Sequence, residues 1–192
     1  MNYLAHMALA GPTDESLVGN LLGDFLKGLD VERLPAGVRR GIRDHQAIDA
    51  FTDRDATVVR ARLRLDERFT HLRRVLLDVF FDHFLAAHWD ALMPDTALPD
   101  LTTRVYRALE LHAGILPERL ARMRPRMEAE DWLGAYRTVE HVERVLTAME
   151  RRLRKPRPLG EGGLQLRVHY DTLEADFLEF FPRLAAFAGD RN

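Results

Sequence analysis

Four pairs of polar residues in the first half of the chain have the residue types of a metal centre. The two members of each pair are four positions apart and lie among apolar residues. The pairs are Asn2 and His6, Asn20 and Asp24, His45 and Asp49, and Asp78 and Asp82. In a helix, residues four positions apart project within about 40° of each other. Each pair is therefore expected to face the interior of a helical protein.

A buried carboxylate is costly unless a cation or several hydrogen-bond donors meet it. Each pair alone has an ordinary explanation: a backbone carbonyl for a core histidine, a helix N-terminus for Asp24, or a bond within one helix for His45 and Asp49. Four pairs together would need four separate compensations, whereas one ion in a bundle core meets all of them. We therefore predict a metal site. The predicted ligands are His6, Asp24, His45 and Asp82.

The metal and its chemistry follow from the ligand types. The chain has no cysteine, which excludes sulfur ligands and thiolate nucleophiles. Imidazole and carboxylate ligands favour Mn²⁺, Mg²⁺ or Fe²⁺, with Zn²⁺ as an alternative. Such an ion holds phosphate oxygens and lowers the pKa of bound water, as phosphodiester hydrolysis requires. Asp49 and Asp78 are predicted as further ligands or as base and orienter of the attacking water, and His83 as proton donor to the leaving group.

Helical spacing dominates the sequence, without strand alternation or a fixed repeat. The stretch 76–90 is apolar on every side, which predicts a central buried helix that carries Asp78, Asp82 and His83. Helices are expected at about 15–27, 35–53, 58–65, 67–93, 101–116, 131–153 and 164–181, the last one ended by Pro182. The predicted fold class is all-α, a helical bundle that forms one domain over residues 1–192.

The composition of the chain limits the classes of partner that we expect. The 28 Lys and Arg residues against 30 Asp and Glu give a net charge of -2, which offers no reason to expect nucleic acid. No apolar stretch reaches about 18 residues, and the N-terminal residues lack the pattern of a signal peptide. We expect a cytoplasmic protein without a membrane or nucleic-acid partner, and the oligomeric state stays open.

Four segments resemble the acyl carrier protein phosphodiesterases, also called acyl carrier protein hydrolases. They are NYLAHM at 2–7, GNLLGDFLKG at 19–28, GIRDHQAIDAFTD at 41–53 and LDVFFDHFLAAHW at 77–89. A C-terminal segment, VHYDTLEADFLEFFPRL at 168–184, extends the resemblance over nearly the whole chain. The resemblance implies an all-helical fold related to the HD phosphohydrolases and a preference for Mn²⁺. It also implies removal of the 4′-phosphopantetheine arm from holo acyl carrier protein, with a free serine left on the apo protein.

The chain departs from the HD phosphohydrolases in one respect. It has no His-Asp dipeptide, only Asp44-His45 and Asp82-His83, so the ligands above are assigned from helical faces.

Two other functions stay open. One is hydrolysis of a nucleotide or other small phosphoester on the same scaffold. The other is a non-catalytic helical module that binds an acidic carrier protein.

Carrier proteins of the kind implied are small and acidic, so a basic surface is expected to receive them. Arg39, Arg40 and Arg43 project from the helix that holds His45, on the side away from its apolar face. They are the first choice because they are expected to adjoin the metal site. The basic runs at 60–68 and 151–155 are the alternatives.

Overall fold

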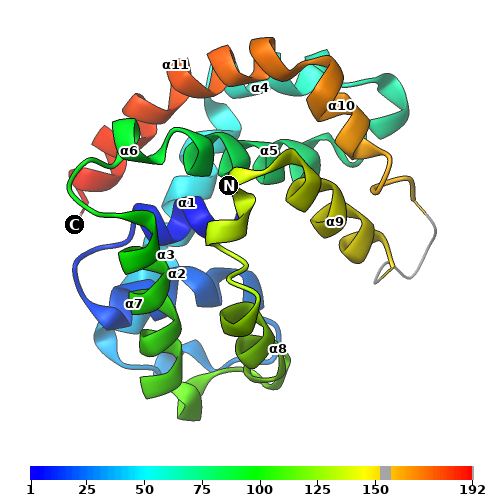
Figure 1. Ribbon diagram of the computed structural model, residues 1–192. Helices are drawn as coiled ribbons and strands as arrows, with labels where there is room; N and C mark the ends of the chain where they lie inside the picture. The colour runs from blue at the N-terminus through cyan, green and yellow to red at the C-terminus, as the bar shows by residue number, and fades with distance from the viewer. Residues whose placement is uncertain (152–156, 192) are drawn as a thin grey trace.

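The computed structural model describes residues 1–151 and 157–191. These residues form helices and contain no strand, which confirms the predicted all-α class (Figure 1). The α-helices are α1 (Tyr3–Ala8), α2 (Asp14–Leu22), α3 (Ala36–Arg54), α4 (Ala56–Arg64), α5 (Arg73–Ala87), α6 (Trp89–Leu92), α7 (Leu98–Leu111), α8 (Glu118–Ala129), α9 (Val139–Glu150), α10 (Gly162–Val168) and α11 (Tyr170–Gly189).

Helix α5 is the centre of the fold, as its apolar sequence predicts. Its residues from Leu76 to Ala86 are buried except Asp78, which is partly exposed. Helices α1, α4, α9 and α11 all contact it. In Figure 1, α11 and α4 lie above α5, and α1 lies below it. Phe81 and Phe84 pack against Phe177 of α11, at ring-centroid distances of 5.3 and 6.0 Å. Burial of these rings anchors α5 in the core.

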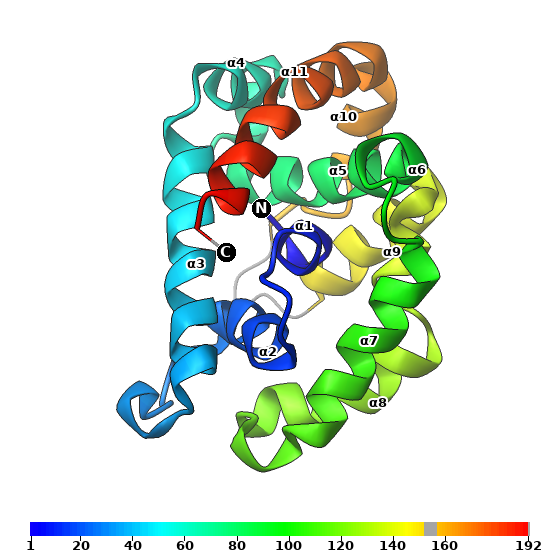
Figure 2. The ribbon, with the colours of Figure 1, turned by 90° about the vertical axis from the view of Figure 1, so that its left-hand side faces the viewer.

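Helices α2 and α3 approach closely through glycine. A Cβ on Gly19 would lie 2.2 Å from the carbonyl oxygen of Val38, and a Cβ on Gly41 would lie 2.6 Å from the carbonyl oxygen of Ser16. Any larger residue at either position would push the two backbones apart. Figure 2 shows α3 as the long helix along one edge, with α2 beside its lower half. This contact brings the end of α2 next to the middle of α3, where His45 lies.

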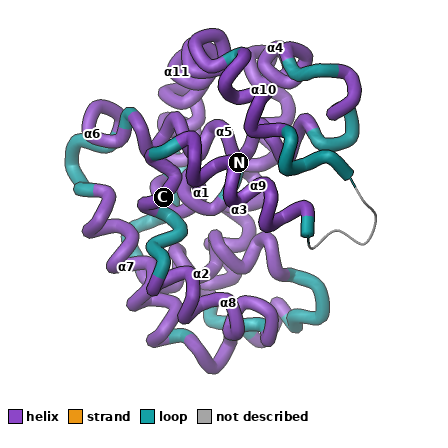
Figure 3. The backbone as a smooth tube through the Cα atoms, turned by 45° about the vertical axis from the view of Figure 1, so that its right-hand side comes forward, coloured by secondary structure: helices purple, strands orange, loops and turns teal. Residues whose placement is uncertain are grey.

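The N-terminal residues run into the middle of the molecule. All three ribbon and tube views place the N-terminus near the centre (Figures 1, 2 and 3). Helix α1 contacts α2, α5 and α7, and its Leu4 and Met7 are buried. A short helix in this position can carry a side chain, His6, into the interior.

Several predicted boundaries are wrong. The helix expected at 67–93 begins at Arg73 and is interrupted at His88. The helix expected at 164–181 is two helices that meet at His169, and α11 continues through Pro182. Proline inside a helix removes a backbone hydrogen bond and costs about 3 kcal/mol. Phe180, Phe181 and Leu184 are buried beside it, and their burial outweighs that cost.

The buried apolar residues of the described parts form one continuous core. No helix within residues 1–151 and 157–191 is both long and apolar enough to cross a membrane.

Candidate metal centre

Three of the predicted site residues meet between α1 and α3. His6 of α1 and His45 of α3 stack, with ring centroids 3.8 Å apart and an interplanar angle of 18°. Asp49 lies one turn after His45 and turns one oxygen to each ring. Its Oδ1 is 3.3 Å from Nε2 of His6, and its Oδ2 is 3.7 Å from Nε2 of His45. The three residues each offer a ligand atom within 4.8 Å of the others. Two imidazoles and one carboxylate at these separations suit a divalent ion.

The two histidines leave buried nitrogens that fit a metal ion. Nδ1 of His6 and Nδ1 of His45 are buried without a hydrogen-bond partner among the described residues, whereas Nε2 of His6 lies 3.3 Å from Oδ1 of Asp49. Buried polar atoms in folded proteins nearly always have a partner. Burial lowers the pKa of His6 from 6.5 to about 3, so the imidazole is neutral near pH 7. The neutral ring is the form that binds a metal.

Asp24 forms the solvent-facing edge of the site. It lies in a turn of 3-10 helix, Gly23–Phe25, that continues α2 beside His45. A Cβ on Gly23 would lie 2.2 Å from Cγ of His45, so the glycine makes room for the ring. Oδ1 of Asp24 is 3.8 Å from Nε2 of His45, and the side chain is 41% exposed. Burial raises the pKa of Asp24, although the charge of His45 opposes the rise. The predicted ligand Asp24 is thus close to His45, beside the group of three.

The α-ammonium of Met1 links Asp49 to Asp78. Its nitrogen is 3.1 Å from Oδ1 of Asp49 and 3.2 Å from Oδ1 of Asp78, and it is buried. Burial alone would lower the pKa of this amine, but the two carboxylates outweigh burial and raise it. The amine is therefore charged near pH 7. Asp78 of α5 faces the site through this cation.

Asp49 is the most connected carboxylate of the site. Burial alone would raise its pKa, but the contact with His6 and the charge of the Met1 ammonium hold the pKa well below its ordinary value. Nη2 of Arg74 also lies 3.4 Å from Oδ2 of Asp49. The carboxylate is therefore ionised and available as a ligand at any pH near neutrality.

Asp82 points toward α1 and positions that helix. Its Oδ2 accepts a hydrogen bond from the backbone N–H of Leu4 at 2.8 Å, and its Oδ1 accepts one from Ala5 at 3.1 Å. The N-terminal N–H groups of a helix have no partner within the helix, so Asp82 satisfies two of them. Burial raises the pKa of Asp82 to about 7. The structure does not bring Asp82 into the group of His6, His45 and Asp49, and its role as a ligand stays a prediction.

His83 faces a different part of the core. Its Nδ1 lies 2.8 Å from the carbonyl oxygen of Tyr136, and its Nε2 lies 3.1 Å from the hydroxyl of Tyr170. Both ring nitrogens therefore have partners on η5 (Gly134–Arg137) and α11. The structure does not bring His83 to the metal centre, because adjacent residues on α5 project about 100° apart.

The cluster of Arg39, Arg40 and Arg43 lies on the far side of α3. At about 100° per residue, all three are at least about 120° away from His45 around the helix. Arg39 donates to the carbonyl oxygen of Glu32 at 2.8 Å, and Arg40 pairs with Asp44 at 3.9 Å. Helical spacing therefore places this cluster and His45 on opposite faces of α3, and the role of the cluster in substrate binding stays a prediction.

The two alternative basic runs differ in how far the structure describes them. Within 60–68, the described arginines pair with carboxylates of the same chain; the partners of Arg60 and Arg64 include the buried Asp176. Most of the run 151–155 lies outside the described residues.

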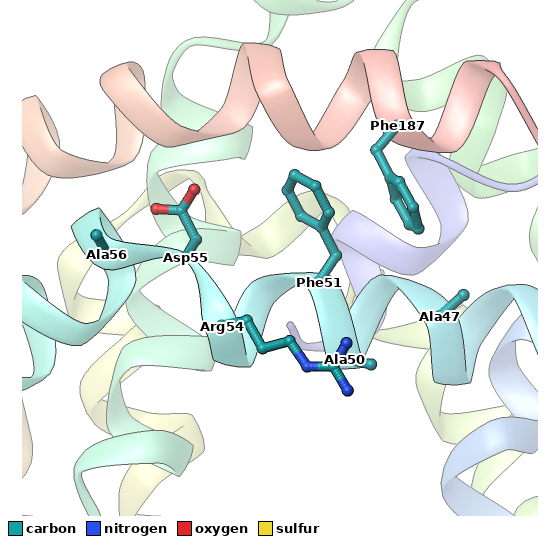
Figure 4. Close-up of a pocket in the computed structure, with 7 residues that line it drawn as sticks. All are labelled: Ala47, Ala50, Phe51, Arg54, Asp55, Ala56 and Phe187. Atoms are coloured by element: carbon teal, nitrogen blue, oxygen red, sulfur yellow. The ribbon is translucent and has the colours of Figure 1, made fainter.

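A groove lies between α3 and α11, on the side of α3 away from His45. Its volume is about 530 Å³, and Figure 4 shows the side chains that form it. The lining residues are Ala47, Ala50, Phe51, Arg54, Asp55, Ala56 and Phe187. The rings of Phe51 and Phe187 stack there at 4.5 Å. This groove is separate from the metal centre.

Sequence reasoning missed two cations of the site, Arg74 and the ammonium of Met1. Arg74 precedes Asp78 by four positions, so the spacing that selects Asp78 also marks Arg74. The ammonium belongs to the backbone, and no pattern of residue types indicates it.

Comparisons with known proteins agree with the resemblance seen in the sequence. A family profile described as acyl carrier protein phosphodiesterase matches residues 1–184. Proteins with that name include one from Enterobacter sp. (strain 638), 34% identical over 192 residues, and one from Klebsiella pneumoniae, 35% identical over 192 residues; each alignment covers all of both chains. Another, from Escherichia coli O139:H28, is 37% identical over 194 residues, which cover all of this chain and 99% of the relative. No solved structure matches. The chain belongs to the acyl carrier protein phosphodiesterase family.

Proposed function

We propose that this protein hydrolyses the phosphodiester that joins 4′-phosphopantetheine to a serine of holo acyl carrier protein. Water adds to phosphorus, the bond from phosphorus to the serine oxygen breaks, and the serine oxygen takes a proton. The products are apo acyl carrier protein and 4′-phosphopantetheine. The name of the family supplies the carrier as substrate. The observation that supports the chemistry is the cluster of two buried histidines, His6 and His45, with the partly exposed Asp49, in which Nδ1 of each histidine has no hydrogen-bond partner among the described residues.

The reaction is proposed to depend on a divalent ion, with Mn²⁺ first and Mg²⁺ or Fe²⁺ as alternatives. His6, His45 and Asp49 would hold the ion, and Asp24 would complete the set from the solvent side, 3.8 Å from His45. The ion would polarise a phosphate oxygen and lower the pKa of a water ligand. This ligand set keeps His6, Asp24 and His45 from the sequence-based assignment. It takes Asp49 as a ligand, which was one of the two roles predicted for it, and leaves out Asp82.

The remaining carboxylates act on the ligands. Asp82 fixes the start of α1 through Leu4 and Ala5, and thereby holds His6, which lies one residue later. Asp78 holds the Met1 ammonium, which in turn contacts Asp49. Groups that orient ligands in this way are needed for affinity and activity almost as much as the ligands.

The substrate determines where the carrier must bind. The scissile bond is attached to a serine on the carrier, so the surface of the carrier has to lie directly against the metal centre. Arg39, Arg40 and Arg43 are on the opposite face of α3 and are not suited to this contact. We therefore expect the carrier to approach over the edge formed by Asp24.

Mass spectrometry of holo acyl carrier protein tests the proposal. The carrier is incubated with metal-stripped protein, with and without added Mn²⁺, and a nucleotide diester is incubated in parallel. We expect loss of the phosphopantetheine arm only with Mn²⁺. Asp49→Asn should abolish the conversion, whereas Asp90→Asn, at an exposed position on α6, should not. If only the nucleotide diester were cleaved, the protein would be a small-phosphoester hydrolase and not a carrier hydrolase. If neither substrate were cleaved although Mn²⁺ is bound, the protein would be a non-catalytic module that binds the carrier.

A further inference from the structure

The mouth of the metal centre is rich in carboxylates. Asp24, Asp49 and Asp78 are at least partly exposed near the two histidines, and Asp53, one turn beyond Asp49 on α3, is partly exposed as well. A phosphodiester carries a negative charge, so several carboxylates facing it would repel it. A substrate of this kind needs an accessible cation beside the ligands.

Arg74 is the accessible cation at this mouth. Its side chain is 52% exposed, and its Nη2 is 3.4 Å from Oδ2 of Asp49. The same oxygen lies 3.7 Å from Nε2 of His45, so the guanidinium and the imidazole both lie close to one carboxylate oxygen. The other cations near Asp49 and Asp53 are less accessible: the Met1 ammonium is fully buried, and Arg62 is 19% exposed.

The surrounding residues hold Arg74 in this place. Nη1 of Arg74 is 3.1 Å from Oδ2 of Asp53, and Nη2 of Arg62 is 2.6 Å from Oδ1 of the same residue. Asp49 and Asp53 are one turn apart on α3, and Arg74 and Asp78 are one turn apart on α5. The carboxylates of Asp49 and Asp53 on α3 therefore both lie within reach of the Arg74 guanidinium on α5. The contact with Asp49 is long and half exposed, so it contributes little and exchanges readily for an incoming anion.

We propose that the guanidinium of Arg74 binds a non-bridging phosphate oxygen of the substrate and stabilises the charge that grows as the serine oxygen leaves. Nη1 stays with Asp53 while Nη2 exchanges Asp49 for the phosphate oxygen, a division of contacts that the planar fork of a guanidinium provides and an ammonium does not. Asp53 and Arg62 orient the side chain without touching the phosphate. This inference rests on the proposed phosphodiesterase function and adds a substrate-binding residue to it.

Three variants test the role of Arg74. Arg74→Gln removes the charge, Arg74→Lys keeps it without the planar fork, and Arg68→Gln is the matched control. Arg68 is 45% exposed and pairs with Glu161, away from the centre. Loss of one hydrogen bond to a charged group weakens binding by about 10- to 100-fold. We expect kcat/KM to fall by about that factor in Arg74→Gln, and by less in Arg74→Lys. Bound Mn²⁺ and the thermal midpoint should match those of Arg68→Gln.

A second measurement does not need turnover. Mn²⁺ bound to the protein should broaden the ³¹P resonance of inorganic phosphate, and a phosphate titration of this broadening gives the phosphate affinity. We expect Arg74→Gln to lower that affinity by about 10-fold or more. Wild-type protein that broadens the resonance through Arg74 but leaves the carrier intact would refute the phosphodiesterase proposal and keep the anion site. Equal kcat/KM and equal phosphate affinity in Arg74→Gln and Arg68→Gln would overturn the inference. So would a loss of Mn²⁺ binding or of stability in Arg74→Gln, because the arginine would then be structural.

Discussion

Replacement of Gly23 by alanine should disable the metal centre without removing a ligand. Gly23 has ordinary right-handed helical dihedrals, with φ -51° and ψ -31°, so its backbone tolerates an alanine. The obstacle is the ring of His45. An added Cβ would lie 2.2 Å from Cγ and 2.4 Å from Cδ2 of that ring. The effect of Gly23→Ala therefore reports on the position of the imidazole.

The size of the effect follows from the space around His45. To reach an ordinary contact of 3.4 Å, the ring has to move by about 1.2 Å. Its other side already stacks on His6 at 3.8 Å, so both rings are displaced together. Overpacking of this kind destabilises a protein by about 1–3 kcal/mol. A displacement of about 1 Å at a reacting centre lowers turnover by about 100-fold.

The assay compares Mn²⁺ affinity, turnover of holo acyl carrier protein and thermal stability in Gly23→Ala and Gly189→Ala. Gly189 is the control, because a Cβ at that position of α11 meets nothing within 4 Å. We expect Gly23→Ala to fold but to lose most of its Mn²⁺ affinity and activity, and Gly189→Ala to keep both. Wild-type Mn²⁺ affinity in a folded Gly23→Ala protein would refute the placement of His45 in the site.

Three further predictions concern individual side chains. Asp49→Ala should abolish Mn²⁺ binding and turnover with unchanged helical circular dichroism; retained Mn²⁺ binding would remove Asp49 from the ligand set. Asp82→Ala should lower the unfolding free energy, because the buried N–H groups of Leu4 and Ala5 lose their partner and each costs about 1–3 kcal/mol. It should also reduce activity, because the start of α1 no longer holds His6 in place. Wild-type stability in a denaturant titration would contradict this. The third prediction concerns pH. His6 has a pKa of about 3 in the folded protein against 6.5 unfolded, so the unfolded chain binds more protons between these values. The unfolding free energy of metal-free protein should therefore fall as pH falls from about 6.5 toward 3, by about 4–5 kcal/mol in full. His6→Gln should show a shallower dependence in denaturant titrations, and an equal dependence would count against the buried neutral imidazole.

Helical spacing was enough to find the core of the site. The pair His45 and Asp49 faces the interior because four residues make about one turn, and His6 meets it because α1 is also helical. The same rule predicts that Asp78 and Asp82 project to one side of α5, and in the structure both contact the N-terminal residues. Periodicity thus selects the side chains that face inward.

Periodicity does not reveal which group each side chain meets. Asp82 meets the N–H groups of α1 because the packing of α1 against α5 places that helix end there. His83 meets Tyr136 and Tyr170, which come from segments far along the chain. Arg43 is exposed on the side of α3 away from its apolar face, as its spacing predicts, but spacing does not show whether a carrier protein meets that side. These distinctions depend on tertiary contacts that spacing does not encode.

Helix boundaries failed where burial outweighs local preference. Pro182 predicts the end of a helix, yet α11 continues to Gly189 with Leu184 in the core. No proline or glycine at His88 predicts the break of the central segment there.

We propose that His6, His45 and Asp49 bind one divalent ion, and anomalous diffraction from crystals soaked in Mn²⁺ would show whether they do. We expect an anomalous peak at about 2.2 Å from nitrogens of His6 and His45 and from an oxygen of Asp49. A peak elsewhere, or fully loaded crystals without a peak among these three side chains, would contradict it.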